Sequence, residues 1–203
     1  LCHLQHSPLL QQPKHSLSNN KCNLNINCIY IKFFNFFSCF LNRKIINNIL
    51  IKLDKFLKIH IEAQIKSGAS IIQIFDSWAG LLPEKDLDYF VYKPIKSLVD
   101  FIRQKKTISI CFPRNINSYK KFVDNVNPDI ISIDYNVDPL IIRDTIDIPV
   151  QGGLDPKILL QNKEIVRNEV TKYLKTFDKK RYTFNLGHGV LPDTNPDMIK
   201  YLV

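Results

Sequence analysis

Hydrophobic residues follow regular spacings from about residue 45 onward. In residues 45–67 the apolar side chains recur at helical intervals, which predicts a helix with one apolar stripe. Gly68 follows as a helix-terminating residue. The next residues, 69–75 (ASIIQIF), form a short apolar run, which predicts a buried strand.

The same order of strand and helix continues along the chain. Further strands are predicted at residues 107–112, 129–135, 148–151 and 181–186, and helices at residues 83–105, 117–126, 138–145 and 155–177, the last with a break near Asn162. A final helix begins at Asn195-Pro196, because Asn195 is a capping residue and Pro196 suits the first helical position.

The five predicted strands are short, apolar on both faces and rich in Ile and Val, which indicates a buried parallel sheet. Strands that alternate with helices allow an open doubly wound sheet or a closed (β/α)8 barrel. No glycine-rich loop with nucleotide-binding spacing follows any of the strands, which favours the barrel. Since a complete barrel needs eight strands, the sequence predicts part of a (β/α)8 TIM-type barrel, of class α/β.

Residues 1–44 follow neither spacing. They are rich in Asn, Ser, Gln, Phe and Cys, and we assign them no regular structure, apart from a possible short helix or strand around residues 29–41. The chain therefore divides into a disordered or out-of-frame segment, residues 1–44, and a partial barrel, residues 45–203. Because the only methionine is Met198, we expect the sequence to be a fragment or the translation of an interrupted reading frame.

The distribution of charge limits the possible partners. The net charge is +9, but residues 1–50 hold five basic and no acidic residues. Residues 51–203 hold the other 23 basic residues and all 19 acidic ones, and the two signs are interspersed. We therefore expect no nucleic-acid partner, because such a partner calls for a clustered basic patch. A mildly positive balance suits an anionic small molecule.

The cysteines and the longest apolar run bear on metal binding and location. Four of the five cysteines lie in the first 40 residues, and none has the spacing of a zinc site. The odd cysteine count favours a reducing compartment, so we expect a cytoplasmic protein without a metal. The apolar run at residues 29–41 is too short to span a bilayer and contains Lys32 and Asn35, so we expect no membrane partner.

Polar residues and glycines gather where each predicted strand ends. The runs are FDSWAG (75–80), FPR (112–114), IDY (133–135), QGGLDP (151–156) and NLGHG (185–189). In a barrel these ends meet at one rim, where active sites are built. Gly187 and Gly189 flank His188, which suits a histidine displayed with space beside it.

The residue types at this rim favour recognition of an anion. A nucleophilic Ser77–His188 pair would lack the usual GxSxG turn, and the rim has no HxH or HxC pair for zinc. Hydrogen bonding of an anion by Ser77, His188 and Arg114 is therefore the favoured chemistry. Structural roles stay open for two carboxylates, since Asp76 suits a loop cap and Asp134 suits an ion pair with Arg114.

Together the runs GASIIQIFDSWAG (68–80), FPR (112–114), SIDYNV (132–137), VQGGLDP (150–156) and FNLGHGVLPDTNPD (184–197) resemble the C-terminal half of the uroporphyrinogen decarboxylase family. The resemblance covers residues 45–203. It implies a cytoplasmic (β/α)8 barrel of haem and porphyrin biosynthesis, a homodimer when complete, with neither metal nor organic cofactor. It also implies a carboxy-lyase whose polyanionic tetrapyrrole substrate, uroporphyrinogen III, loses four acetate carboxyls to give coproporphyrinogen III.

The resemblance assigns substrate contacts to Ser77 and His188, and supporting roles to Asp76, Arg114, Asp134 and Asn185. The family's arginine-rich motif, its aspartate and a substrate-contacting tyrosine belong to the N-terminal half and have no counterpart in residues 1–44. We therefore identify no catalytic residue in this chain and expect it to be truncated and inactive as written.

One departure from the family pattern lies within the matching part. Gly153 stands where the family usually has Asn, and loss of that amide predicts a looser turn. Two other functions remain open: a non-catalytic remnant or interaction fragment of the barrel, and a related methyltransferase of corrinoid metabolism. The second is disfavoured, because those enzymes bind zinc through His and Cys residues that are not paired here.

Overall fold

The computed structural model describes residues 26–30, 43–178 and 181–203. The strands in these residues are β1 (Ile26–Tyr30), β2 (Ile71–Asp76), β3 (Ile108–Pro113), β4 (Ile130–Ile133), β5 (Val150–Gly152) and β6 (Tyr182–Thr183). The α-helices are α1 (Arg43–Lys66), α2 (Glu84–Leu87), α3 (Lys93–Gln104), α4 (Tyr119–Val126), α5 (Pro139–Thr145), α6 (Lys163–Thr176) and α7 (Pro196–Leu202).

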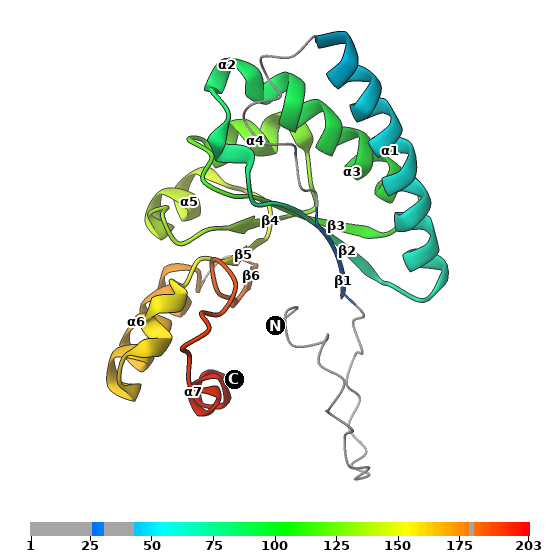
Figure 1. Cartoon of the computed structure of the whole chain (residues 1–203). Helices are drawn as coiled ribbons and strands as arrows, with labels where there is room; N and C mark the ends of the chain where they lie inside the picture. The colour runs from blue at the N-terminus through cyan, green and yellow to red at the C-terminus, as the bar shows by residue number, and fades with distance from the viewer. Residues whose placement is uncertain (1–25, 31–42, 179–180) are drawn as a thin grey trace.

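These strands form one parallel sheet in the sequential order β1-β2-β3-β4-β5-β6. Figure 1 shows α1, α3 and α4 covering one face of the curved sheet, with α6 beside β5 and β6. Helices that are neighbours along the chain also touch, as α3 does with α4 and α6 with α7. Among the described residues β1 and β6 each pair on one side only, so the sheet is an incomplete (β/α)8 barrel.

Strand β1 lies in the segment to which the sequence pattern assigned no regular structure. It pairs in parallel with β2, from Ile26 beside Ile71 to Tyr30 beside Phe75. The run INCIY mixes polar and apolar residues too briefly for a clear period, so the sequence did not separate it from its surroundings. The rest of the segment, residues 1–25 and 31–42, lies outside the described residues, as does most of the possible element at residues 29–41.

The helix-facing side of the sheet carries the hydrophobic core. Ile72 and Ile74 of β2, Cys111 of β3 and Ile131 of β4 are all fully buried, and they pack with α3 and α4. The residues that alternate with them lie on the opposite face, because side chains of a strand point to its two faces in turn. This inner face is mixed in character. Its members include Gln73, Phe75, Phe112, Ser132 and Gln151.

A proline divides the helix predicted at residues 83–105. The structure has α2, a π-helical turn (Asp88–Tyr92) and then α3, in direct succession. Pro94 has no backbone N–H to donate to Phe90, and the preceding Lys93 N–H donates to the Asp88 carbonyl, five residues back. The wider turn is the local response to that missing hydrogen bond.

The predicted break near Asn162 and the predicted cap at Asn195 are both confirmed. Asn162 divides the segment at residues 155–177, and its side chain accepts a hydrogen bond from the Ile165 N–H at 3.0 Å, at the start of α6. Asn195 caps α7 in the same way, accepting from the Asp197 N–H at 2.9 Å. Among the described helices, none combines the length and the apolar character that crossing a bilayer requires.

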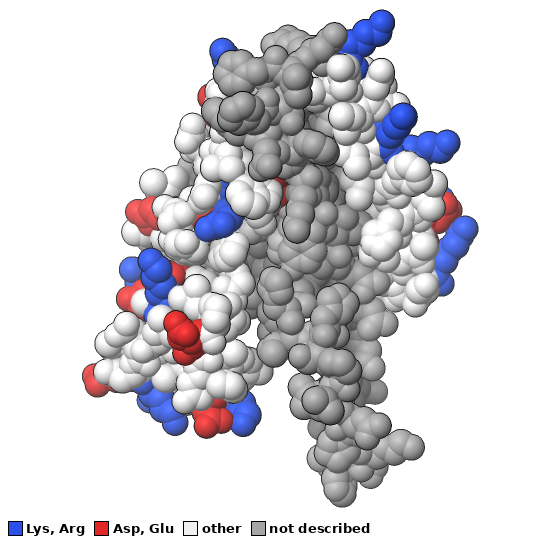
Figure 2. Space-filling model, viewed as in Figure 1, with Lys and Arg blue, Asp and Glu red and all other residues white. Residues whose placement is uncertain are grey.

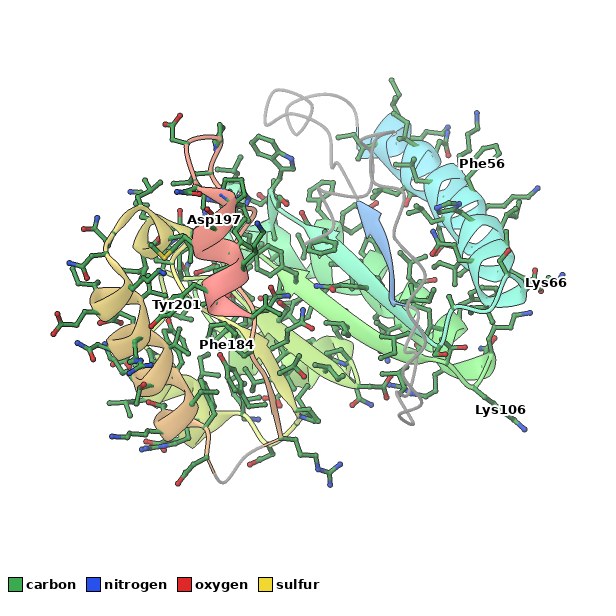
Figure 3. The ribbon with its side chains drawn as sticks, turned by 90° about the horizontal axis from the view of Figure 1, so that it is seen from below. Phe56, Lys66, Lys106, Phe184, Asp197 and Tyr201 are labelled. Atoms are coloured by element: carbon green, nitrogen blue, oxygen red, sulfur yellow. The ribbon has the colours of Figure 1, made fainter. Side chains whose placement is uncertain are left out.

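Two phenylalanines allow the core to be tested against the surface. Phe122 of α4 is 0% exposed and meets the Tyr92 ring edge-on at 5.7 Å, whereas Phe56 of α1 is 67% exposed. Figure 3 shows Phe56 on the side of α1 that faces away from the sheet. Phe122→Ala should lower the free energy of unfolding by about 3–5 kcal/mol. Phe56→Ala should change it by about 0.5 kcal/mol or less.

Urea unfolding followed by circular dichroism measures both effects. Equal losses in the two variants would contradict the placement of α4 in the core.

Candidate functional site

The polar residues singled out in the sequence do lie at one edge of the sheet. Asp76 is the last residue of β2, Arg114 follows β3, and Asp134 follows β4. Because the strands are parallel, their C-terminal ends share this edge. The Arg114 N–H donates to the Asp76 carbonyl oxygen at 3.0 Å, which joins the first two ends directly.

Asp76 shapes the turn that carries Ser77. Its Oδ1 accepts a hydrogen bond from the Trp78 N–H at 3.2 Å, and the Ala79 N–H also bonds to this carboxyl group. Asp76 therefore caps its own loop, one of the roles left open by the sequence. Ser77 is half-buried, and its hydroxyl makes no hydrogen bond within the described part of the chain.

The Asp76 carboxyl group is also unusual in its burial. The residue is 1% exposed, and Oδ2 has no hydrogen-bond partner among the described residues. Burial raises the pKa of Asp76 to about 7, although the bonds from the Trp78 and Ala79 N–H groups act in the opposite direction. The group therefore exchanges its proton near neutral pH.

Gly80 holds the β2 loop against the β3 loop. Its N–H donates to the Arg114 carbonyl at 3.0 Å. A Cβ atom on Gly80 would lie only 2.0 Å from the Asn115 carbonyl oxygen, so no other residue fits without a backbone shift. The glycine of the FDSWAG run is thus required by a close approach of two loops.

The ion pair considered between Arg114 and Asp134 does not form. The Asp134 side chain is 0% exposed, and its Oδ2 accepts from the Asn115 N–H at 2.6 Å and the Tyr119 hydroxyl at 3.0 Å. Its Oδ1 accepts from the Asn136 N–H at 2.7 Å. Burial, reinforced by the charge of Asp134, raises the pKa of Tyr119, so this hydroxyl keeps its proton and remains a donor.

Strand β5 ends at Gly152 and the turn after it begins at Gly153, and their φ angles are +91° and +108°, a region that other residues rarely adopt. The Tyr182 hydroxyl donates to the Gly152 carbonyl at 2.8 Å, and the Tyr173 hydroxyl donates to the Gly153 carbonyl at 2.6 Å. A Cβ at Gly153 would lie 2.7 Å from the Tyr173 ring. Tyrosines thus bind this turn, which the sequence predicted to be looser without the asparagine.

The segment after β6 is joined to the β5 end by backbone bonds. The Leu154 N–H donates to the Asn185 carbonyl at 3.4 Å, and the Gly187 N–H donates to the Leu154 carbonyl at 2.7 Å. The Asn185 side chain accepts from the Leu186 N–H at 2.8 Å, a local role in the shape of the loop. Asn185 therefore supports the loop through its own backbone and that of its neighbour.

Gly187 brings the His188 loop against the end of β4. A Cβ on Gly187 would lie 2.5 Å from the Tyr135 nitrogen and 2.8 Å from the Asp134 carbonyl carbon. Glycine is therefore needed for this contact. His188, the next residue, is exposed at the rim.

Tyr135 is a rim residue that the sequence analysis did not single out. It is half-buried, and its hydroxyl accepts a hydrogen bond from Arg114 Nη2 at 3.4 Å. The sequence signal for it is its place in the IDY run, at the end of a predicted strand beside Asp134. A continuous set of contacts thus runs from the Ser77 turn through Arg114 and Tyr135 to the His188 loop.

The structure also bears on nucleophiles and metals. Cys111 is 0% exposed within β3, and burial raises the pKa of its thiol, so it is not a candidate nucleophile. Within the described ranges, no three His, Cys, Asp or Glu side chains are grouped as a metal site would require.

The parallel sheet, with its polar loops at the C-terminal rim, places the chain in the class of (β/α)8-barrel proteins. A family model described as Uroporphyrinogen decarboxylase (URO-D) matches residues 32–203. The chain belongs to the uroporphyrinogen decarboxylase family. The match begins upstream of residue 45, where the resemblance seen in the sequence began.

Curated relatives agree with the family match. The chain is 43% identical over 152 residues to "Uroporphyrinogen decarboxylase" of Rickettsia bellii (strain RML369-C), covering 71% of this chain and 44% of the relative. It is 40% identical over 147 residues to the protein of the same name from Rickettsia felis (strain ATCC VR-1525 / URRWXCal2), covering 70% and 42%. The chain therefore spans less than half the length of these relatives.

The buried Asp76 predicts a pH-dependent stability. Its pKa of about 7 in the folded chain lies above the ordinary value of 3.8, so between these pH values the folded state keeps a proton that the unfolded state has released. Stability should therefore fall as pH rises, by about 3 kcal/mol between pH 5 and 8. Asp76→Asn removes this titration, so the variant should gain stability relative to the unmodified chain over that range.

Urea unfolding at both pH values measures the difference. Asp124→Asn, which removes an exposed carboxylate of α4, is the matched control. If the two variants show the same pH dependence, the burial of Asp76 is refuted.

A second prediction concerns the contact between the two loops. Gly80→Ala should lower the free energy of unfolding by about 3 kcal/mol or more, because the added methyl group would clash with the Asn115 backbone. The clash could be relieved only by moving one loop away from the other. Gly68→Ala is the matched control. Its φ of +98° strains an alanine, but nothing lies within 4 Å of the added Cβ. Thermal unfolding of both variants tests this, and a smaller loss at Gly80 than at Gly68 would show that the loops do not approach closely.

Proposed function

We propose that this chain carries the C-terminal part of a uroporphyrinogen decarboxylase site, in which Ser77 and His188 contact carboxylates of the porphyrinogen. The observation that carries this proposal is the continuous set of contacts joining the Ser77 turn, Arg114, Tyr135 and the His188 loop at one rim. The family name of the relatives supports the substrate class.

The chemistry of the rim suits a polyanionic substrate. The Ser77 hydroxyl and the Arg114 guanidinium are hydrogen-bond donors, and His188 is exposed at the same rim. Figure 2 shows Lys and Arg interspersed with Asp and Glu over the described part of the visible face, which is not the pattern of a nucleic-acid groove. We therefore favour a small carboxylated ligand over a polymer.

The complete reaction would remove four acetate carboxyls from uroporphyrinogen III, giving coproporphyrinogen III without a metal or organic cofactor. The described sheet is open at β1 and β6. Among the described residues we identify none that would transfer the proton. We propose that this chain alone binds the porphyrin without turnover, and that the complete enzyme is a cytoplasmic homodimer. Release of coproporphyrinogen by the chain alone would contradict the first part.

Binding can be measured with uroporphyrin, the stable oxidised form of the substrate. Trp78 is the only tryptophan in the chain and lies 50% exposed in the Ser77 turn, so quenching of its fluorescence reports porphyrin at the rim. Ser77→Ala and His188→Asn should each weaken binding about tenfold, the effect of one lost hydrogen bond to a charged group.

Two substitutions of the same type away from the rim serve as controls. Ser70→Ala changes an exposed serine just before β2, at the opposite end of the sheet, and His60→Asn changes an exposed histidine of α1. Both should leave uroporphyrin affinity unchanged. A chain that unfolds cooperatively but binds no uroporphyrin would instead favour the non-catalytic fragment.

A further inference from the structure

We propose that Arg114 and Tyr135 together form a carboxylate-binding subsite between Ser77 and His188. The inference rests on the proposed function and adds to it a position for one substrate carboxylate. The two residues come from adjacent strand ends, after β3 and within the loop after β4.

Arg114 has unused hydrogen-bonding capacity. A guanidinium group carries five N–H donors. Within the described part of the chain, its side chain makes one long hydrogen bond, from Nη2 to the Tyr135 hydroxyl at 3.4 Å. Its Nε is buried without a partner there. A buried donor is costly to leave unpaired, so the arrangement calls for an acceptor.

The neighbouring carboxylates do not neutralise this cation. Both oxygens of Asp134 are occupied by Asn115, Tyr119 and Asn136. Asp76 is bound to the amides of its own turn, and no ion pair joins it to Arg114 among the described residues. The positive charge of Arg114 is therefore available to a ligand.

Tyr135 completes the subsite. Its hydroxyl accepts from Arg114, so its own hydrogen remains to be donated toward the same ligand. The planar fork of the arginine matches the two oxygens of a carboxylate, and the tyrosine offers one further donor. Contact of Gly187 with the Tyr135 backbone sets the subsite directly beside the His188 loop.

The geometry also places this subsite next to the first predicted contact. The Arg114 N–H is bonded to the Asp76 carbonyl at 3.0 Å, and Asp76 immediately precedes Ser77. A ligand with several carboxylates on one ring can therefore meet Ser77, Arg114 and His188 together. A ligand with a single carboxylate has no such advantage.

Uroporphyrin titration with Trp78 fluorescence, in a phosphate-free buffer, tests the proposal on the full chain. Arg114→Gln should weaken binding about tenfold or more, and Tyr135→Phe by a few-fold. Arg114→Lys keeps the positive charge but loses the planar pair of donors, so its affinity for uroporphyrin should lie between that of Arg114→Gln and that of the unmodified chain. The combined Arg114→Gln, Tyr135→Phe variant should lose less than the two single effects added, because both residues hold one carboxylate.

Arg143→Gln is the matched control. Arg143 is a partly exposed arginine of α5 whose Nε and Nη2 are already bonded to Asp144, at 2.7 and 3.2 Å. The substitution Arg143→Gln removes the same positive charge from the chain and should leave uroporphyrin affinity unchanged. If Arg143→Gln lost as much uroporphyrin affinity as Arg114→Gln, the change in net charge alone would explain both losses, and the proposed subsite would be wrong.

The outcomes separate this proposal from the one beneath it. If Ser77→Ala weakens binding but Arg114→Gln and Tyr135→Phe do not, the subsite is wrong and the proposed function stands. If the unmodified chain binds no uroporphyrin, both proposals fail. Urea unfolding checks that each variant is folded. If Arg114→Gln does not fold, the test depends on Arg114→Lys and Tyr135→Phe. Weaker uroporphyrin binding by these two variants supports the subsite, and unchanged binding overturns it.

Discussion

The buried carboxylate of Asp134 organises the rim of this sheet. It is fully enclosed, yet it is matched by donors from the β3 loop, from α4 and from its own loop, through Asn115, Tyr119 and Asn136. A buried charge is tolerated only when it is bonded in this way. Because these uncharged groups satisfy it, the arginine beside it is left with its charge available, and the loop of His188 rests on the adjoining backbone.

Much of the fold could be predicted from local patterns. Alternating apolar runs and helical stripes identify five of the strands and most of the helices, because burial imposes those periods on the sequence. Capping residues such as Asn162 and Asn195 mark helix starts for an equally local reason, a side chain accepting from the first N–H groups. Parallel strands then place Asp76, Arg114 and Asp134 on one edge, so the gathering of the candidate residues at this edge was also predictable.

The features that were not predicted depend on contacts between distant segments. Strand β1 exists through its pairing with β2, which no period within INCIY reveals. Whether Asp134 would meet Arg114 or the hydroxyl of Tyr119 is decided by packing of α4, and sequence gives only the possible partners. The hydrogen bond between Arg114 and Tyr135 likewise appears only when the ends of β3 and β4 are seen side by side. Pro94 in the sequence predicts an irregularity in the helix, but it does not predict that the irregularity is a π-helical turn.

The short length of β6 has a consequence for how firmly the two sides of the rim are held. Strand β2 has six residues and is paired on both edges, whereas β6 has two residues, paired to β5 alone among the described strands. Beyond it, the loop of His188 is anchored to Leu154 by two backbone bonds. Segments with so few protected amides open locally at low free energy, so amide hydrogen exchange would be fast there and slow along β2. The end of β2 is therefore the rigid side of the rim, and the His188 loop after β6 is the mobile side. A ligand that contacts both sides orders the His188 loop, and the lost conformational entropy reduces its affinity.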